Sequence, residues 1–537
     1  MSTPQPVIDF QKITATNPAT GEVIGYSQIH TPEEGREAIR RARAAQPAWE
    51  ALPLHERKQY MWRLRDYLVE HADEVSDVIS KDVGKTHIEA LSTEVLPTVM
   101  AITYYTRSAR RFLKPHWIPH GAILFFNKVS TMYRVPFGVV GVIAPWNYPM
   151  GIPMHEIVPA LLTGNTVVFK TAAETQLVGR KIEEMLKAVG LPQDVFIFLN
   201  ISGSQVSQIM LEPGNHVDKL FFTGSVPVGK QLMAEAAKTL TPVCLELGGN
   251  DAMLVCEDAN LERAVNGAVW GGLQNSGQSC GGVERIYVHK AIYEPFLKLL
   301  KETVDNLRQG PDLDYNVDVG AMCTKRQVQA VQRQVDDALA KGARIHAQAR
   351  VAPDYANKGN FFPATVLVDV NHDMEVMREE TFGPVLCVMP VNDMAEAVRL
   401  ANDSQLGLTG SVWSNSLRQA RQLGHQIKAG VITLNDHLLT HGMAETPWGG
   451  FKESGIGRSH GRLGFDEMTE PQVVVNEMLY FSKRNVFWHP YGKDVYTGMR
   501  GTLDLFYSPR LLNRLIGLWR FTVLSMRMFI SGRRPVK

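Results

Sequence analysis

The chain has 537 residues, more than one hydrophobic core normally holds, so its length predicts about two to four domains. Hydrophobic residues make up 45% of it and charged residues 21%, which is typical of a globular protein and excludes a disordered or fibrous one. The formal net charge of +1 gives the whole chain no field that would gather nucleic acid, so a nucleic-acid partner is not expected.

Cysteine usage and the start of the chain bear on its compartment. The five cysteines are widely spaced and include no C-x-x-C pair, so neither a disulfide framework nor a metal site is expected. The first dozen residues, MSTPQPVIDFQK, lack the basic start and long apolar run of a signal peptide, and no stretch of about 20 apolar residues follows to span a bilayer. We therefore expect a cytoplasmic protein.

Residues 31–112 are predicted to form helices. In TPEEGREAIRRARAAQPAWEAL, Thr31 suits an N-cap, Pro32 suits the first helical position, and Glu34 completes a capping box. Apolar residues follow at helical spacing, so these helices should pack one face against a core.

From about residue 129 the pattern changes to apolar, β-branched runs that end at Pro or Gly and alternate with helical segments. This alternation predicts parallel strands joined by crossover helices, and hence an α/β fold with helices on both faces of each sheet. Two series of runs predict two Rossmann-like sheet domains. The first includes GVVGVIAPW, TVVFK, DVFIFLN, KLFFTGS and PVCLELGG, and the second DAMLVCEDANL, RIYVHK, PATVLVDV, GPVLCVMPV and GVITLND.

Two turns that follow strands of the first series carry candidate site residues. In APWNYP, the side-chain amide of Asn147 suits donation to a developing oxyanion, although Asn is also a common turn residue. FFTGSVPVGK satisfies G-x-x-x-x-G-K, but Gln231 stands where a P-loop has Ser or Thr for Mg²⁺, so an ATPase is rejected. A strand, a Gly-Ser turn and a helix start still offer backbone N–H groups to a pyrophosphate.

LELGGND places Glu246 within an otherwise apolar strand that runs up to a pair of glycines, which permit a close approach of backbone or ligand. Burial of this carboxylate would raise its pKa toward that of a general base near neutral pH. The alternative is a structural carboxylate that caps the following turn.

NSGQSCGG places Cys280 among small, turn-favouring residues. Backbone N–H groups and a nearby helix start are expected to lower the pKa of its thiol, as suits a nucleophile. The alternative is a buried cysteine that acts only as a small hydrophobic residue.

The ordered set of motifs resembles the aldehyde dehydrogenase superfamily over roughly residues 14–475. It comprises NPATGE, APWNYP, GNTVVFK, FTGS, LELGG, GQSC, EETFGPV and PWGGFKESGIGR. The resemblance implies that Cys280 is the nucleophile, Glu246 the general base and Asn147 an oxyanion donor. It further implies a thioester on Cys280 that water hydrolyses to the free acid, because relatives that pass the acyl group to coenzyme A typically lack this glutamate.

The same resemblance implies NAD or NADP as cofactor. Its adenosine and pyrophosphate would lie against Trp146, Lys170, Gly224, Ser225 and Gly229, and its nicotinamide ribose against Glu380 and Phe382.

Two positions depart from the family pattern. Members that prefer NAD usually carry Glu three residues after the lysine, where this chain has Ala173, with Glu174 shifted by one place; this favours measurable use of NADP. Glu156 stands where many relatives carry Lys, so cofactor contacts at that position are not carried over.

The resemblance implies four parts. They are a cofactor domain of residues 1–117 and 137–247, a catalytic domain of 248–440, a small β bridging and oligomerisation element of 118–136 and 441–478, and a C-terminal extension of 479–537. In relatives the bridging element pairs subunits, so a homodimer or homotetramer is expected.

The C-terminal extension lies beyond the usual end of the family and is basic, with eleven Lys and Arg against two Asp. SPRLLNRLIGLWRFTVLSMRMFI is predicted to form an amphipathic helix, whose apolar face includes Leu512, Leu515, Trp519, Val523, Met526 and Ile530. Such a helix fits the surface of a membrane, a subunit contact or a cover over the substrate tunnel.

The function expected is oxidation of an aliphatic aldehyde of medium or long chain, with Tyr148 and Trp448 near the substrate tunnel. A dehydrogenase for a short semialdehyde, such as succinate semialdehyde, is the alternative within the family. A cysteine esterase would not need the cofactor residues, and a non-catalytic scaffold would not need Cys280, Glu246 and Asn147 together.

Overall fold

The computed structural model describes residues 12–356 and 358–530. The chain divides into two compact units. Residues 1–114 and 134–470 form the first, and residues 115–133 and 471–537 form the second.

The first unit contains a six-stranded sheet that is parallel except for one edge strand, β19, which runs antiparallel to β9. Its strands in spatial order are β19 (Gly455–Ile456), β9 (Val243–Glu246), β8 (Lys219–Thr223), β5 (Val139–Ile143), β6 (Thr166–Lys170) and β7 (Phe196–Phe198).

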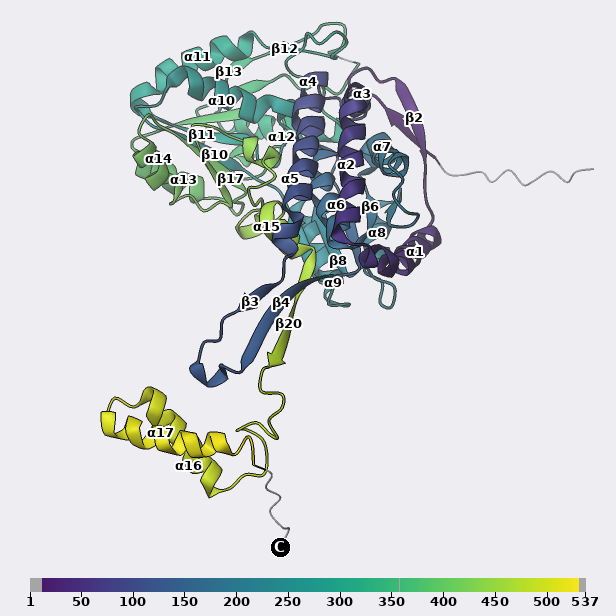
Figure 1. Cartoon of the computed structure of the whole chain (residues 1–537). Coiled ribbons are helices and arrows are strands. Elements are labelled where there is room, and N and C mark those ends of the chain that lie inside the picture. Colours follow the sequence, from purple (N-terminus) through teal and green to yellow (C-terminus); the bar gives the residue numbers. More distant parts are fainter. Residues whose placement is uncertain (1–11, 357, 531–537) are drawn as a thin grey trace, which may run out of the picture. The chain divides into compact units, whose positions relative to one another are not determined.

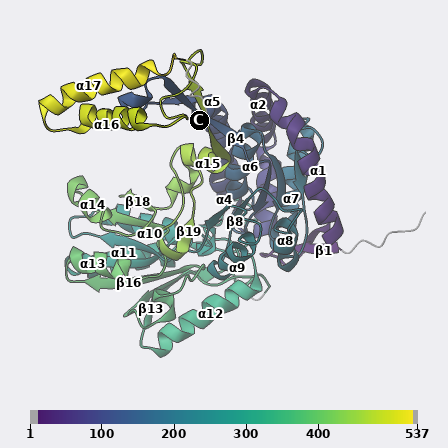
Figure 2. The ribbon, with the colours of Figure 1, turned by 90° about the horizontal axis from the view of Figure 1, so that it is seen from below.

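Helices cover both faces of this sheet. On one face lie α6 (Gly151–Thr163) and α7 (Gln176–Ala188), with α2 (Leu54–Glu70), α3 (Ala72–Val83) and α5 (Leu96–Leu113) packed outside them. On the other lie α1 (Pro32–Ala51), α8 (Gly203–Met210) and α9 (Val226–Ala236); α1 and α8 are in contact (Figure 2).

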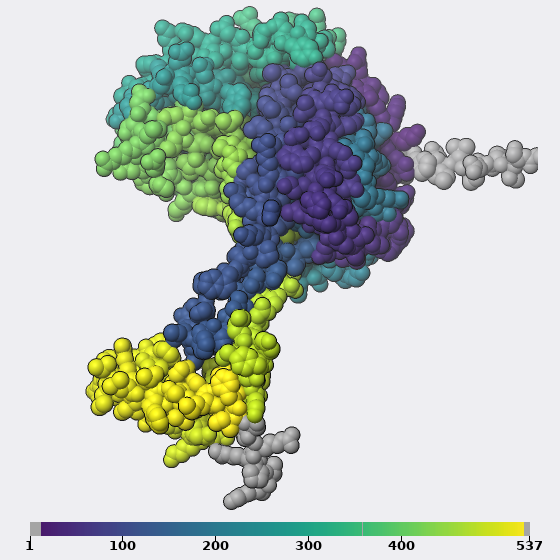
Figure 3. Space-filling model, viewed as in Figure 1, coloured from purple at the N-terminus to yellow at the C-terminus, as the bar shows by residue number. Residues whose placement is uncertain are grey.

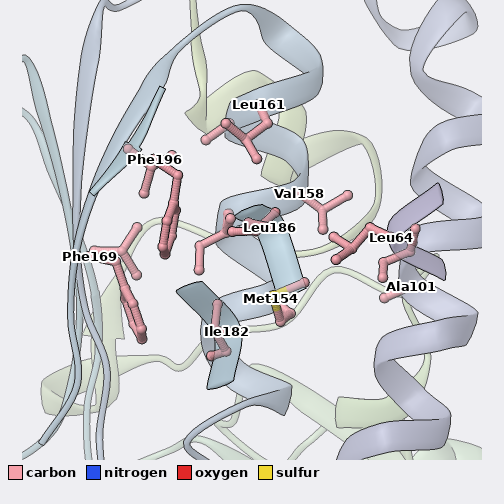
Figure 4. Packing of buried hydrophobic residues seen from close by; sticks show 14 of the residues in the cluster. Leu64, Ala101, Met154, Val158, Leu161, Phe169, Ile182, Leu186 and Phe196 are labelled. Carbon is pink, nitrogen blue, oxygen red and sulfur yellow. The ribbon is translucent and has the colours of Figure 1, made fainter. Parts of the chain in front are cut away.

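The larger core cluster joins strands to two layers of helix. Figure 4 shows Phe169 and Phe196 of the sheet facing Leu161 and Leu186 of the inner helices. Farther out, Leu64 of α2 and Ala101 of α5 pack beside α6, and the helices α2 and α5 run side by side (Figure 1). This packing explains why α6 is buried on every side and why its sequence is almost entirely apolar.

A second sheet of seven strands completes the first unit and is parallel except for β13. Helices α10 (Leu261–Leu273) and α11 (Tyr293–Asp305) pack on one face, and α12 (Lys325–Ala340), α13 (Met394–Asn402) and α14 (Leu417–Gly424) on the other. The strand order is β13 (Arg344–Gln348), β15 (Thr365–Val368), β16 (Val385–Val391), β11 (Val283–His289), β10 (Asp251–Val255), β17 (Thr409–Trp413) and β18 (Val431–Leu434). The predicted α/β class with two sheet domains is confirmed.

Short elements connect these parts of the first unit. They are the strands β1 (Lys12–Thr16), β2 (Val23–Gln28), β12 (Arg308–Gln309) and β14 (Arg350–Val351), the helices α4 (His87–Ala90) and α15 (Gly461–Glu467), and the π-helix η1 (Leu91–Val95).

The second unit contains a three-stranded sheet in the order β20 (Thr469–Glu477), β4 (Lys128–Pro136) and β3 (His116–Ile118). It also contains two helices, α16 (Lys493–Tyr507) and α17 (Leu511–Met526), which form a hairpin (Figure 1). Their atoms are among those coloured yellow in Figure 3. Of these two, only α17 was predicted. The basic residues Arg533, Arg534 and Lys537 of the predicted tail lie outside the described residues.

Glycines form the contact between the two tail helices. A Cβ on Gly501 would stand 2.3 Å from the Cβ of Arg520, and one on Gly517 would stand 2.6 Å from the carbonyl oxygen of Gly501. The helices therefore touch along backbone. The apolar face predicted for α17 points elsewhere, with Leu512 68% and Trp519 72% exposed.

The structure corrects the extent of the bridging element. Residues 441–470, expected within it, belong to the first unit. The reason is their contacts: His441 and Trp448 line a cavity with Cys280, and Ser459 bonds to Glu246.

Candidate active site

Cys280 lies in a turn between α10 and β11, beside a cavity of the first unit. Its side chain is partly exposed, whereas the other four cysteines are buried. Glycines allow this placement, because a Cβ on Gly249 would stand 2.1 Å from the carbonyl oxygen of Cys280. The glycine pair after Glu246 thus permits a close approach of backbone, as the sequence predicted.

The pKa of the Cys280 thiol is raised well above its usual value, which corrects the predicted lowering. Burial is the main cause, and the charges of Glu246, Glu380 and Asp251 add to it. No helix begins at Cys280, since the chain continues from the turn into strand β11. The Cys280 thiol therefore carries its proton near neutral pH.

Glu246 is the last residue of β9 and is buried. Its Oε1 accepts a hydrogen bond from the Ser459 hydroxyl at 2.5 Å. Burial raises its pKa to about 7, although the bond from Ser459 acts in the opposite direction. A carboxylate with this pKa is suited to accept a proton near neutral pH.

Asn147 is buried in the turn that follows β5. Its Nδ2 donates to the carbonyl oxygen of Gln278 at 3.1 Å, two residues before Cys280. One N–H of the amide makes this bond, which leaves the other for a ligand. The structure thus brings the Asn147 turn and the Cys280 turn together.

The residues expected to bind the pyrophosphate lie at the carboxyl ends of neighbouring parallel strands. Lys170 ends β6 and is buried, which lowers the pKa of its ammonium group. Gly224 and Ser225 follow β8, and Ser225 is the N-cap of α9 without a side-chain capping bond. Crevices at such strand ends are where open α/β sheets bind nucleotides, so these residues fit a dinucleotide.

Close packing explains the third glycine of this loop. A Cβ on Gly229 would stand 2.6 Å from a methyl carbon of Leu247, so the residue allows α9 to approach the end of β9. The following Lys230 forms an ion pair with Glu453 at 2.7 Å.

Trp146 and Phe382 are in contact, and Glu380 lies against the glycine pair that follows β9. The rings of Trp146 and Phe382 lie 5.3 Å apart, edge to face. Glu380 Oε1 accepts from the backbone N–H of Gly249 at 3.0 Å, and burial raises the pKa of this carboxyl group to about 7. Phe382 has a positive φ of 50°, which bends the chain at this point.

Ala173 begins a short 3-10 turn just after β6 and is exposed, and Glu174 beside it is partly buried. The charge of Glu174 acts on Lys170, so this carboxylate is close to the proposed adenosine side of the site. Ala173 leaves its own position without a charge.

The cavity beside Cys280 is mainly aromatic and aliphatic. Tyr148 and Trp448, both predicted near the substrate, are among its lining residues, and the Tyr148 hydroxyl donates to Gln274 Oε1 at 2.6 Å. The complete lining is Ser92, Thr93, Pro97, Tyr148, Trp270, Gln274, Ser279, Cys280, Leu438, Leu439, His441, Gly442 and Trp448. None of these is Lys or Arg.

Three histidines near this cavity were missed by sequence reasoning. The rings of His155 and His460 stack at 3.8 Å, and His441 lies 5.3 Å from His460. The Tyr105 hydroxyl and His155 Nδ1 are 2.7 Å apart. Glu156, next to His155, is also buried, and burial together with the charge of Glu246 raises its pKa well above the usual value. Nothing in the local sequence around these histidines signals their convergence.

Lys85 and Glu94 were also missed. They form a fully buried ion pair at 2.7 Å, and Lys85 Nζ donates to the carbonyl oxygen of Asn147 at 2.8 Å. A buried charge pair leaves no mark in the sequence beyond two charged residues in a helical region.

Metal chemistry and membrane insertion were not expected. Within the described residues, no group of three or more His, Cys, Asp or Glu is arranged to hold a metal ion. In the same part of the chain, none of the helices is long and apolar enough to cross a bilayer.

Comparison with known proteins matches residues 8–474 to the model of the aldehyde dehydrogenase family. The chain is 36% identical over 496 residues to a 4,4'-diapolycopene aldehyde oxidase of Methylomonas sp, covering 92% of this chain and 91% of that protein. It is also 36% identical to a putative succinate-semialdehyde dehydrogenase [NADP(+)] of Mycolicibacterium smegmatis, covering 85% of this chain and 87% of that protein.

A solved structure has the same fold. The NAD+ complex of an aldehyde dehydrogenase from Bacillus cereus superimposes with a TM-score of 0.83 at 31% identity, covering 87% of this chain and 94% of that one. From its match over most of its length, this chain belongs to the aldehyde dehydrogenase family, the enzymes that oxidise aldehydes with NAD or NADP.

Proposed function

We propose that this enzyme oxidises an apolar aldehyde of medium or long chain to the free carboxylic acid through a thioester on Cys280. The observation that carries the proposal is the convergence of three groups around the Cys280 turn. Cys280 lines the cavity and is partly exposed. Asn147 is bonded two residues before it, and Glu246, buried with a pKa of about 7, is near enough for its charge to act on the thiol.

In the proposed reaction the Cys280 thiol releases its proton to solvent as its sulfur attacks the aldehyde carbon. The free N–H of the Asn147 amide and the backbone N–H of Cys280 stabilise the resulting oxyanion. Collapse of that intermediate leaves an acyl thioester on the sulfur. Glu246 then takes a proton from water as the water attacks the thioester. It returns that proton to the departing Cys280 sulfur, which releases the acid and restores the thiol.

The cofactor supplies the acceptor for the hydride that leaves the aldehyde carbon. Trp146, Lys170, Gly224, Ser225 and Gly229 would hold its adenosine and pyrophosphate. Glu380 and Phe382 would hold the nicotinamide ribose. The uncapped helix start at Ser225 and the buried cation of Lys170 suit a diphosphate, since both favour negative charge.

The choice of an apolar aldehyde rests on the cavity. Tyr148, Trp270, Leu438 and Trp448 offer aromatic and aliphatic surface to a chain attached at Cys280. A short acidic semialdehyde would need a cation for its carboxylate, and none lines this cavity. Lys85, which lies over the Tyr148 ring, is already paired with Glu94.

The test is an aldehyde panel from succinate semialdehyde to long alkanals, followed by the absorbance of reduced cofactor. Wild-type kcat/KM should rise with alkyl chain length, and Cys280→Ala should abolish turnover with every substrate while still binding NAD or NADP. Turnover retained by Cys280→Ala would remove the mechanism. A preference for succinate semialdehyde would replace only the substrate class.

We also propose that the enzyme is a homodimer or homotetramer assembled through the second unit. Strand β20 is an edge of the three-stranded sheet, and its residues Val473, Val474 and Val475 are 41 to 54% exposed. A second copy would cover this apolar edge. Sedimentation equilibrium should therefore give a dimer or tetramer mass.

Peripheral contact with an anionic membrane is proposed for the hairpin of the second unit, in a cytoplasmic enzyme. Its exposed apolar side chains include Leu512, Leu515 and Trp519, and several arginines of the same helices can meet lipid phosphates. In addition, the alignment with the diapolycopene aldehyde oxidase covers 92% of this chain. Residues 1–478 are a smaller share of the 537 residues, so the alignment also includes part of the C-terminal extension.

The membrane contact is tested by sedimentation with phosphatidylserine vesicles. Leu515→Ser combined with Trp519→Ser should lose binding, and high salt should weaken it in the wild type. Leu313→Ser is the control, because Leu313 is 67% exposed but lies in the first unit. Equal binding by all three proteins would refute this contact.

A further inference from the structure

The ion pair behind Asn147 is completely buried. Lys85 Nζ and Glu94 Oε1 are 2.7 Å apart, and neither side chain is exposed. Lys85 follows the C-terminal glycine of α3, and Glu94 belongs to the π-helix η1. Burying two charges is costly unless their remaining donors and acceptors are also satisfied, so the other bonds of this pair indicate what it serves.

Those bonds go to one short segment, residues 147–151. Lys85 Nζ donates to the carbonyl oxygen of Asn147 at 2.8 Å, and it lies 4.2 Å from the ring centroid of Tyr148. Glu94 Oε2 accepts from the backbone N–H groups of Met150 at 2.8 Å and Gly151 at 3.2 Å. The pair thus holds the segment at both of its ends.

A second set of bonds ties this segment to the Cys280 turn. Asn275 Nδ2 donates to the carbonyl oxygen of Asn147 at 3.0 Å and to that of Gln278 at 3.1 Å. Glu89 Oε1 fixes Asn275 in turn by accepting its backbone N–H at 2.7 Å. The direction of the Asn147 amide relative to Cys280 is therefore set by buried polar contacts on both sides.

We propose that Lys85 and Glu94 are positioning residues that hold the Asn147 amide where the oxyanion forms. This inference rests on the proposed function, in which Asn147 is the side-chain donor to the oxyanion. The pair touches neither substrate nor cofactor and acts through the backbone of residues 147–151. Loss of the pair would let the amide turn away and slow acylation, while Cys280 and the cofactor residues stay in place.

The discriminating variant removes both charges together. Lys85→Met/Glu94→Gln leaves no unpaired buried charge, so its melting temperature should lie near that of the wild type, whereas Lys85→Met alone should melt lower. The double variant should nevertheless form reduced cofactor about tenfold to a hundredfold more slowly in a single turnover, less than the loss from removing an oxyanion donor outright. KM for NAD or NADP should change less than about twofold.

Background dependence separates positioning from a general structural effect. In an Asn147→Ala background the same double substitution should cause no further loss, because the group being positioned is gone. Equal losses in both backgrounds would overturn the inference, as would wild-type acylation by the double variant. Lys219→Met/Glu467→Gln is the matched control. It removes another ion pair of the first unit, and it should not slow acylation.

Two further results complete the design. If the double variant does not fold, Glu94→Gln alone keeps the shape and the acceptor of the side chain and should slow acylation several-fold only when Asn147 is present. Full activity of Asn147→Ala would instead contradict the proposed function, since the donor itself would be dispensable. Failure of the inference and failure of the function therefore give different results.

Discussion

At the scale of single residues, the proposed general base Glu246 is expected to control how the reaction responds to pH. Burial raises the pKa of its carboxyl group to about 7, and only the ionised carboxylate can take a proton from water. Thioester hydrolysis should therefore accelerate as pH rises from 6 to 8, with a midpoint near pH 7.

Rapid-quench and steady-state measurements check this expectation. In Glu246→Gln, a burst of reduced cofactor should precede a slow steady state that no longer depends on pH in this range. Absence of the burst, with acylation and hydrolysis slowed together, would mean that Glu246 serves mainly to deprotonate Cys280.

Ala173 is expected to permit use of NADP. A glutamate here would repel a 2′-phosphate, so Ala173→Glu should lower kcat/KM for NADP at least tenfold relative to NAD, about 1.4 kcal/mol. Steady-state kinetics with both cofactors measure the ratio. A wild type that already excludes NADP would indicate that Glu174 supplies the missing repulsion.

Much of the site could be predicted from residue types in ordered motifs, but its electrostatics could not. Sequence motifs pointed to Cys280, Glu246 and Asn147, and the structure places Asn147 against the turn of Cys280. The raised pKa of the thiol depends on burial and on carboxylates that come from distant segments, such as Glu380 and Asp251. Tertiary contacts of that kind leave no local pattern to read.

At the scale of elements, short sequence patterns predicted a helix start correctly where bonds between nearby residues determine it. The capping box of Thr31 and Glu34 is present at the start of α1, since it needs only residues three apart. Helix α16 was not predicted. Its N-cap residue, Gly492, offers no side-chain cap, and the helix is held by its contact with α17, so no local sequence pattern marks it.

That hairpin should be sensitive to the size of one residue. Gly501→Val places its Cβ only 2.3 Å from the Cβ of Arg520, so the helices must separate, at a cost of about 1–3 kcal/mol. Limited proteolysis should then cut within residues 493–526 faster than in the wild type. Gly121→Val is the control in the same unit, because a Cβ there meets nothing within 4 Å.

At the scale of the whole molecule, the first unit is expected to carry out catalysis, and the second to affect the use of long aldehydes. Removing residues 493–537 should leave oxidation of short aldehydes within about twofold of the wild type, because every proposed site residue belongs to the first unit. Oxidation of long aldehydes presented in vesicles should fall. If truncation changes neither chain-length preference nor vesicle binding but dissociates the oligomer, the tail is a subunit contact.

The extent of the units shows why whole-chain boundaries are hard to predict. Residues 441–470 follow the last strand of the second sheet and carry no sign of the domain they join. They are fixed in the first unit by contacts with residues far away in sequence, such as the bond from Ser459 to Glu246.

The stacked histidines couple the folded state to acid. Burial lowers the pKa of His441 to about 4 and also lowers those of His155 and His460 well below their usual value, whereas in an unfolded chain all three would titrate near 6.5. Below about pH 6.5 these histidines therefore bind protons in the unfolded chain but not in the folded chain. The free energy of unfolding falls as the pH is lowered, until the histidines of the folded state also titrate.

Buried carboxyl groups with raised pKa values, such as Glu246 and Glu380, act in the opposite direction, so the histidine contribution is isolated by substitution. Between pH 8 and pH 5, the melting temperature of His155→Phe should fall by less than that of the wild type. His346→Phe is the control, because His346 lies away from the stack, and its melting temperature should fall by as much as that of the wild type. Acid would thus destabilise the fold of the first unit through the three histidines near the Cys280 cavity.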